Sequence, residues 1–343
     1  MRVTIKDIAT AAGVKPAVVS AVLNGSRTIR FSDKTRDRIL ELVRKMRYRP
    51  NRVAQGLVTK KSRLIGVLCY SPRDPSAARI IDELQTQLSE QGYNAIFGFW
   101  RDAISARSAF ESVLVYPLDG LICIHSELYD MIPENLPTVF GEYIDDSKCS
   151  VIPDTSGFIR SGLEYLTGLG HRRIGYFSWV NPVLAEKFVQ TAKELGVETS
   201  AAWSPRGTGF YDKAIELGSN LFRSDHLPTA LLCTNDITAF AAINAARAAG
   251  LRIPEDISII GMDNIDIAGY FDPPLTTFAF PYHEYVAQTL ECLFAGALPG
   301  CRKIRMPLVV RKTAAPPGKA APVLPQGCPA DPVRQKNSAK EPA

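Results

Sequence analysis

Apolar residues in the first part of the chain recur at the spacing of short amphipathic helices. Residues 4–12 place isoleucines and alanines on one face, and Thr4 and Asp7 form a capping box at the start of this helix. Gly13 ends the helix, and after a short turn residues 16–24 form a second helix with proline at its first position. The pattern therefore predicts two helices joined by a glycine turn.

A third helix is predicted over residues 33–46, because Ser32 is a preferred N-cap residue and Ile39, Leu42 and Val43 lie on one stripe. Two short helices across a glycine turn are typical of a helix-turn-helix, whose second helix lies in the DNA major groove. Many helical hairpins of this size bind no nucleic acid, so the spacing alone leaves simple packing as an alternative.

From residue 64 the pattern changes to short apolar runs that alternate with helical stretches. The predicted strands are 64–70, 94–99, 120–124, 138–140, 174–177, 230–233 and 257–261. The helical stretches between them include 77–91, 156–168, 184–195 and 237–249. Strands that alternate with helices predict an α/β body with a doubly wound parallel sheet.

Charge separates the two parts of the chain. Residues 1–63 carry 16 Lys and Arg against 4 Asp and Glu, whereas residues 64–313 carry 20 against 29. The nearly neutral overall balance therefore conceals a strongly basic head on an acidic body. Such a head is typical of phosphate contact with release of counterions, so the charge favours DNA binding over simple packing.

Sequence motifs in both parts of the chain match a known family. In the head they are 4–9, 12–14, 19–20, 22–25, 35–36 and 48–54. In the body they are Asp154, Gly157, 169–175, 234–236, 250–261, Asp263 and 274–277. Through these motifs the chain resembles the lactose-repressor/galactose-repressor family (LacI/GalR) of bacterial transcriptional regulators, closely in the head and more loosely in the body to about residue 313.

The resemblance implies a division into four parts. These are a helix-turn-helix domain at 1–50, a hinge helix and linker at 51–63, an effector-binding and dimerisation domain at 64–313, and a disordered tail at 314–343. The body would have two subdomains like those of periplasmic binding proteins. The first would comprise about 64–155 and 282–300, and the second about 156–281 and 301–313.

The resemblance also implies how the head meets DNA. A hinge helix at 51–58 would fold on the operator, with Leu57 pushed into the minor groove and Ala54 small enough for two hinge helices to approach closely. The residues expected to contact phosphates are Thr4, Lys15, Ser20, Asn24, Ser32, Thr35, Tyr48 and Asn51.

The positions that read bases in this family are Pro16, Ala17 and Ala21 here. None of these side chains can make a bidentate hydrogen bond to a base, although alanine can touch a thymine methyl group. The loop before Ser32 is longer than the family usually shows, and it brings Arg27 and Arg30. We therefore expect specificity to depend on these arginines, on Leu57 and on DNA deformability.

Effector contacts carry over unevenly. Asn235 and Asp263 match family positions that hydrogen-bond a bound small molecule, and Glu142 and Trp203 match more weakly. Leu184 stands where the family has an arginine that can capture a carboxylate or neighbouring hydroxyls. Three further departures from the common pattern are Ser76, Ala77 and Phe280. The usual sugar or purine ligand is therefore not implied for this chain.

Other residue types exclude several classes of function. Cys69, Cys123 and Cys233 fall in apolar strand runs and the 7 cysteines form no CxxC pair, which favours buried thiols in a reducing cytoplasm. The 4 histidines, His171 among them, are isolated, so no metal site or cofactor is predicted. The sequence contains neither a nucleophile elbow nor a phosphate-binding loop, so no motif in it indicates an enzyme. The N-terminus has no apolar core of a signal peptide, and no apolar run approaches the length of a membrane span.

The sequence predicts a transcriptional regulator of the cytoplasm, associated with the nucleoid, and a repressor is favoured over an activator. It is expected to bind a pseudo-palindromic operator on double-stranded DNA as a homodimer. The tail lacks the leucine heptads of a tetramerising zipper. A small-molecule effector in the cleft between subdomains would control DNA binding. Two alternatives stay open: a DNA-binding regulator without an effector, and a transport-type binding protein for small molecules.

Overall fold

The computed structural model describes residues 3–25, 29–48, 61–100, 103–124, 131–141, 151–179, 182–207, 211–224, 226–295 and 301–318. They belong to two compact units. The first comprises residues 1–64 with the short segment 117–119, and the second comprises 65–116 and the chain from 120 onward. The predicted limits of the subdomains inside the body stay predictions.

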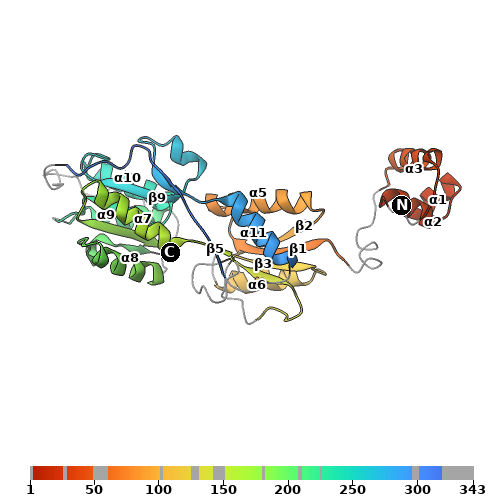
Figure 1. The fold of residues 1–343 in the computed structure, drawn as a ribbon, viewed down its shortest axis with the longest axis horizontal. Coiled ribbons are helices and arrows are strands. Elements are labelled where there is room, and N and C mark those ends of the chain that lie inside the picture. The colour runs from red at the N-terminus through yellow and green to blue at the C-terminus, as the bar shows by residue number, and fades with distance from the viewer. Residues whose placement is uncertain are drawn as a thin grey trace, which may run out of the picture. The chain divides into compact units, whose positions relative to one another are not determined.

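The first unit is a bundle of three helices (Figure 1). They are α1 (Ile5–Ala12), α2 (Pro16–Leu23) and α3 (Asp33–Lys45). The capping box is confirmed: the Asp7 amide donates to the Thr4 hydroxyl at 3.4 Å, and the Thr4 amide donates to the Asp7 carboxylate at 2.8 Å. Gly13 ends α1 with a left-handed φ of 71°, a conformation that glycine adopts without steric cost.

The core of this small bundle is aliphatic. Its buried residues are Ile8, Ala9, Ala12, Val19 and Ile39. Ser32 caps α3 by accepting from the Thr35 amide at 3.2 Å. The three predicted helices and the cap of the third are therefore confirmed.

The first lobe of the body, called lobe one, is a four-stranded sheet in the order β2-β1-β3-β4. Its strands are β1 (Leu64–Tyr70), β2 (Asn94–Trp100), β3 (Gly120–Cys123) and β4 (Thr138–Phe140), and its helices are α5 (Pro75–Glu90), α6 (Ala103–Leu114) and α11 (Tyr282–Ala295). Helices α5 and α11 pack together on one face of the sheet, and α6 covers the other face (Figure 1). The late helix α11 packs against α5, β3 and β4 of lobe one, although it follows the strands of lobe two in the chain.

The second lobe of the body, called lobe two, is a six-stranded sheet in the order β12-β10-β9-β8-β6-β7. Its strands are β6 (Ile174–Trp179), β7 (Arg206–Gly207), β8 (Ala230–Cys233), β9 (Ser258–Asp263), β10 (Thr276–Ala279) and β12 (Leu308–Val309). Its helices are α7 (Thr155–Gly168), α8 (Pro182–Glu194), α9 (Tyr211–Leu221) and α10 (Asp236–Ala248), with short 3-10 helices η2 (Ala201–Trp203) and η3 (Asp266–Gly269). Only the edge pair of β10 with β12 is antiparallel among the described strand pairs of this sheet. The parallel, doubly wound body is confirmed.

Two further strands connect the lobes. β5 (Val151–Pro153) pairs in parallel with β11 (Arg302–Ile304), and the two form a separate sheet. β5 leads into α7 of lobe two, whereas β11 follows α11 of lobe one and leads toward β12. The crossing chains are therefore hydrogen-bonded to each other.

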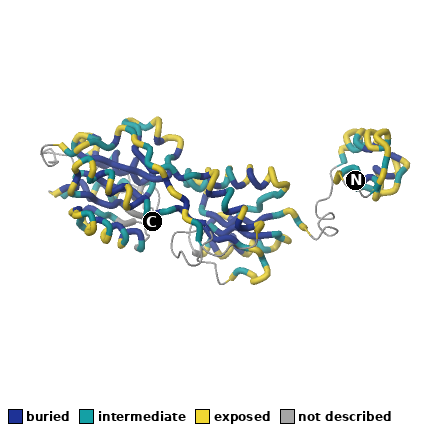
Figure 2. Tube along the Cα trace, viewed as in Figure 1, coloured by how far each residue is buried: buried dark blue, intermediate teal, exposed yellow. Residues whose placement is uncertain are grey.

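The core follows the strands (Figure 2). Every residue of β3, β8 and β9 is buried, because helices cover both faces of a parallel sheet. Cys69 in β1, Cys123 in β3 and Cys233 in β8 are free and buried, as the sequence predicted.

Gly175 in β6 lies where neighbouring atoms leave no room for a β-carbon. A β-carbon there would collide with the carbonyl oxygen of Trp203 and lie 2.7 Å from Leu231 Cδ2. We therefore expect Gly175→Ala to lower the free energy of unfolding by about 1–3 kcal/mol through overpacking. Urea unfolding followed by circular dichroism measures this loss.

Gly168 supplies the matched control. It lies in α7, and a β-carbon there meets nothing within 4 Å. Gly168→Ala is expected to leave stability unchanged or raise it slightly, because alanine favours helix. Equal destabilisation by both substitutions would contradict the packing argument.

Candidate functional site

The helix α2 presents its first turn at the surface of the head. Lys15 is the N-cap residue in an extended conformation, and its side chain makes no capping hydrogen bond. Lys15, Pro16 and Ala17 are exposed. Ala21, in contrast, is only 4 % exposed. Its methyl group is covered by the head itself, so Pro16 and Ala17 are the described base-reading candidates that a DNA base could touch.

Several phosphate candidates hydrogen-bond to each other in the free head. The side-chain NH₂ group of Asn24 donates to the Ser20 hydroxyl at 3.2 Å, and the hydroxyls of Ser32 and Thr35 are 2.9 Å apart. Thr4 is engaged in its capping box. These contacts fix the rotamers of short polar side chains at helix ends, where phosphates commonly bind.

The remaining head candidates differ in exposure. Tyr48 is partly buried and packs on the core of the head, whereas Arg30 is exposed. Five predicted site residues lie outside the described residues: Arg27, Asn51, Ala54, Leu57 and Glu142. The predicted hinge helix at 51–58 lies outside them as a whole.

In the body, polar residues gather where the strands of lobe two end. Asn235 and Asp236 follow β8, and Asp263 is the last residue of β9. Ligands of doubly wound sheets bind outside these carboxyl ends. The side-chain oxygen of Asn235 accepts from the Thr238 amide at 2.8 Å and so caps α10. Asn235 is thus a helix cap whatever else it binds.

Asp236 is fully buried and hydrogen-bonded. Its carboxylate accepts from the Thr277 hydroxyl at 2.5 Å and from the Ile265 amide at 2.9 Å. Burial raises the pKa of Asp236 to about 7, although these hydrogen bonds and the charge of Arg311 oppose the rise. The sequence motif contained Asp236, but only its environment shows that it joins β8 to β10 and to the loop after β9.

Asp263 has the least favourable surroundings for a negative charge among the aspartates of this region. Its side chain is 7 % exposed, and its backbone has a φ of 109°, which is rare for a residue other than glycine. Burial and the negative charges of Asp236 and Asp74 hold the pKa of Asp263 well above its ordinary value. Among the described residues, none donates a hydrogen bond to its carboxylate.

Asp74 brings a third carboxylate to the same place from lobe one. It caps α5 through one oxygen, which accepts from the amides of Ser76 and Ala77 at 2.9 Å and 3.0 Å. Burial raises the pKa of Asp74, while these two hydrogen bonds lower it. The charges of Asp74 and Asp236 thus act together to raise the pKa of Asp263.

Two arginines approach the loop after β9. Arg79 of α5 donates to the Asn264 carbonyl at 3.2 Å, pairs with Asp266 at 3.4 Å, and lies over the Tyr282 ring at 4.3 Å. Arg311 donates to the Asn264 side-chain oxygen at 2.7 Å. Both guanidinium groups are thus bound to Asn264 and its neighbours, and neither is hydrogen-bonded to the Asp263 carboxylate.

Trp203, for which an effector contact is predicted by resemblance, lies in the interior of lobe two. Trp203 is 2 % exposed, and its indole N–H donates to the His226 carbonyl at 2.8 Å. Its backbone packs against Gly175, near the amino end of β6. A ligand at the carboxyl ends of the strands would not meet this side chain, so Trp203 is a core residue.

Leu184 and His171 have structural surroundings. Leu184 is 5 % exposed and belongs to the body's core. An apolar side chain that packs in the core therefore stands where the family has an arginine. The His171 ring nitrogens lie 2.9 Å from the Thr229 hydroxyl and 2.8 Å from the Ala315 carbonyl oxygen. This confirms the interpretation of His171 as a structural residue. No group of three or more metal-ligand side chains occurs among the described residues.

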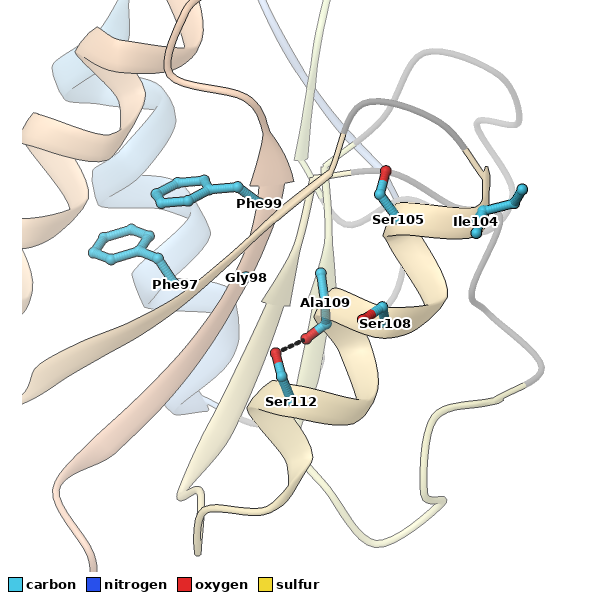
Figure 3. Close-up of a pocket in the computed structure, with 8 residues that line it drawn as sticks. All are labelled: Phe97, Gly98, Phe99, Ile104, Ser105, Ser108, Ala109 and Ser112. Atoms are coloured by element: carbon cyan, nitrogen blue, oxygen red, sulfur yellow. Dashed lines mark hydrogen bonds between the residues drawn. The ribbon is translucent and has the colours of Figure 1, made fainter.

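A separate groove of about 510 Å³ lies on lobe one between β2 and α6 (Figure 3). Its helical side carries Ile104, Ser105, Ser108 and Ser112. Strand β2 is an edge strand of its sheet, and none of the residues that line this groove belongs to the group Asp74, Asp236 and Asp263. It offers no titratable side chain for chemistry.

Comparison with known proteins agrees with both parts of the structure. A model described as bacterial regulatory proteins of the lacI family matches residues 4–51, and a periplasmic binding protein-like domain matches residues 163–314. The chain belongs to the lacI family of bacterial regulatory proteins. It is therefore a helix-turn-helix transcriptional regulator with a periplasmic binding protein-like body.

Individual relatives make the similarity more specific. The HTH-type transcriptional repressor PurR of Pasteurella multocida is 30% identical over 307 residues, which cover 85% of this chain and 91% of that protein. PurR of Klebsiella pneumoniae is 32% identical over 299 residues, covering 81% and 85%. A crystal structure of the lac repressor dimer bound to operator and the anti-inducer ONPF has a TM-score of 0.81 and 25% identity, covering 92% of this chain and all of that one. No helix among the described residues is long and apolar enough to cross a membrane.

The environment of Asp263 makes a prediction about stability and pH. Because the folded chain holds a proton on this carboxyl more tightly than the unfolded chain does, stability falls as pH rises above the ordinary value of 3.8. Asp263→Asn removes this loss and keeps a side chain that tolerates positive φ. We expect the variant to be more stable than the natural protein by about 1–3 kcal/mol at pH 8, and the gap to shrink toward pH 4.

Asp82→Asn, on the exposed side of α5, is the control. It makes the same change of atoms and charge outside this group of aspartates. Urea unfolding of the three proteins at several pH values measures the differences. A stability gap for Asp263→Asn that is independent of pH, or equal to that of Asp82→Asn, would contradict the assigned environment.

Proposed function

We propose that this regulator represses transcription by binding a pseudo-palindromic operator as a homodimer, under the control of a small molecule in the cleft between lobes. The observation that carries the proposal is the basic three-helix head, which exposes the first turn of α2. PurR proteins are named as transcriptional repressors, and the lac repressor structure is a dimer bound to operator. Both support the proposal.

In this proposal the phosphate contacts fix the position of the head on the duplex. Lys15, Ser32 and Thr35 lie at or near helix N-termini, and Arg30 adds an exposed positive charge. Direct base readout is limited to Pro16 and Ala17, which have no side-chain donor or acceptor. Sequence preference therefore depends on DNA shape and on Arg27 and Leu57, by resemblance to the family.

A second copy of the chain is proposed because lobe one exposes large apolar side chains. Phe99 is 43% exposed at the end of β2, and Ile104 is 86% exposed on α6. Val115 and Tyr116, directly after α6, are 76% and 47% exposed. Several large apolar side chains exposed on one lobe are typical of protein contact. Two copies would place two heads on the two half-sites of the operator.

The effector is proposed to bind where the carboxyl ends of the strands meet. Asp263 lies there, the amide NH₂ group of Asn235 is the part of that side chain not used as a cap, and Glu142 is retained by resemblance. A ligand with different affinity for two arrangements of the lobes would shift the affinity for DNA. The lac repressor structure contains an anti-inducer, which supports this type of control.

We also propose that the chain acts in the cytoplasm and catalyses no reaction. Its DNA target is there, and the named relatives are repressors. The cleft carboxylates are engaged in capping, in structural hydrogen bonds or in mutual repulsion.

Lys15→Ala tests the contact of α2 with DNA. We expect weaker binding to operator and to random DNA alike, and a decrease of about 1 in the slope of log K against log salt, because one phosphate contact is lost. Fluorescence anisotropy on operators selected from random DNA measures both quantities.

Lys312→Ala is the matched control, since it removes one exposed lysine from the body. It should leave affinity and salt slope unchanged. An unchanged slope for Lys15→Ala would show that this lysine does not touch the backbone. Failure of the natural protein to bind any selected DNA at low salt would reject the proposed function itself.

Leu57→Ala tests the hinge that the family resemblance implies. Loss of a wedge in the minor groove should weaken binding to the selected operator more than binding to random DNA. Anisotropy on the two DNAs measures this ratio. Equal affinity of the variant and the natural protein for the operator would exclude a role for Leu57.

A further inference from the structure

We propose that the ligand of this regulator carries a protonated amine, which the carboxylate of Asp263 binds with Asp74 beside it. This inference rests on the proposed function, because it specifies the ligand class of the same cleft. It starts from an imbalance in the cleft: Asp263 is almost completely buried, and no described residue donates a hydrogen bond to its carboxyl group. Helix α5, which Asp74 caps, reaches the next residue of the chain, Asn264, through Arg79.

The three carboxylates differ in what they still lack. Asp236 accepts two hydrogen bonds from lobe two and is a structural residue. Asp74 uses one oxygen to cap α5, and the other oxygen accepts no hydrogen bond among the described residues. Asp263 has no donor at either oxygen among the same residues. The side-chain oxygens that could still accept a hydrogen bond from a cationic donor therefore belong to Asp263 and Asp74.

The positive charges of the protein do not meet this demand. Arg79 donates to the Asn264 carbonyl and pairs with Asp266, which is exposed, and Arg311 is held by the Asn264 side chain and the Leu275 carbonyl. A guanidinium group over the Tyr282 ring shows that this part of the cleft accommodates a cation. The protein places its arginines around these aspartates and leaves Asp263 for another partner.

Ligand classes other than amines fit these aspartates less well. An anion would be repelled by the three carboxylates, and Leu184 stands where the family's anion-capturing arginine would be. The carboxylates do not form a metal-binding group. A neutral polyol could exchange hydrogen bonds with the Asp263 carboxyl group, but it brings no positive charge to Asp263 and Asp74, whereas a protonated amine does so once the Asp263 proton has left to solvent. A protonated amine supplies both the charge and several donors, and charge-assisted hydrogen bonds are the strong ones.

Binding of an amine would also connect the lobes. Asp74 belongs to lobe one, and Asp263 belongs to lobe two. A cation between them replaces repulsion by attraction and so favours the closed arrangement. The ligand would therefore have different affinities for closed and open lobes, which is the condition for control of DNA binding.

The test uses the full chain and pairs of probes that differ in charge. The pairs are glucosamine with N-acetylglucosamine, tyramine with 4-ethylphenol, and 1,4-diaminobutane with 1,4-butanediol. Thermal shift finds the binders, and calorimetry measures their affinities. We expect at least one amine to raise Tm while its neutral counterpart does not.

Asp263→Asn should weaken that amine about tenfold or more, because a charge-assisted contact is lost. Asp82→Asn should not change it. A merely structural Asp263 would give a variant that is more stable and binds the amine as before, so the affinity ratio separates the two roles.

Three results would overturn the inference: no amine binds, a neutral counterpart binds equally well, or Asp263→Asn leaves amine affinity unchanged. Operator binding in the same samples distinguishes this failure from failure of the proposed function. If a neutral sugar or nucleobase changes operator affinity, the regulator stands and the amine class is rejected. If no operator is bound but an amine is, the regulatory function is rejected and the ligand class is kept.

Discussion

The cleft side of lobe two depends on one buried carboxylate. Asp236 begins α10 and accepts hydrogen bonds from Thr277 of β10 and from Ile265 in the loop after β9, so it joins the start of α10 to both of them. Gly261 faces it, and a β-carbon at that position would collide with the Asp236 carboxylate. A negative charge in this place raises the cost of a second one, and Asp263 is that second carboxylate. Structural order and ligand chemistry at this edge therefore have a common origin.

The elements that the sequence predicted correctly are those in which local chemistry and global packing agree. The Thr4 and Asp7 capping box, Gly13 and Ser32 fix helix ends through neighbours in the chain, and apolar runs such as Leu64–Tyr70 are long enough to show their pattern. The strands β5 and β11 were not predicted, because each has only three residues and each is defined by a partner far along the chain. Periodicity has no information about such a pair.

Site residues were harder to predict because the same residue type serves two purposes. Asn235 and Asp263 stand at neighbouring strand ends, yet the first completes a helix cap while the second lacks any donor. Trp203 was matched by position, but its side chain is oriented by Gly175 and the His226 carbonyl. Asp74 was missed altogether, since a helix-capping aspartate before a proline gives no sign that two carboxylates of lobe two lie near it.

The pairing of β5 with β11 has a mechanical consequence. Two separate linkers would let the lobes slide, tilt and move apart independently, whereas a hydrogen-bonded ribbon resists stretching and shear of one strand past the other. Twisting is the deformation that a narrow ribbon allows most easily. The chain crosses between the lobes a third time, from β10 to α11, so twisting of the ribbon and bending of this short connection are the deformations through which a small molecule at the cleft would act.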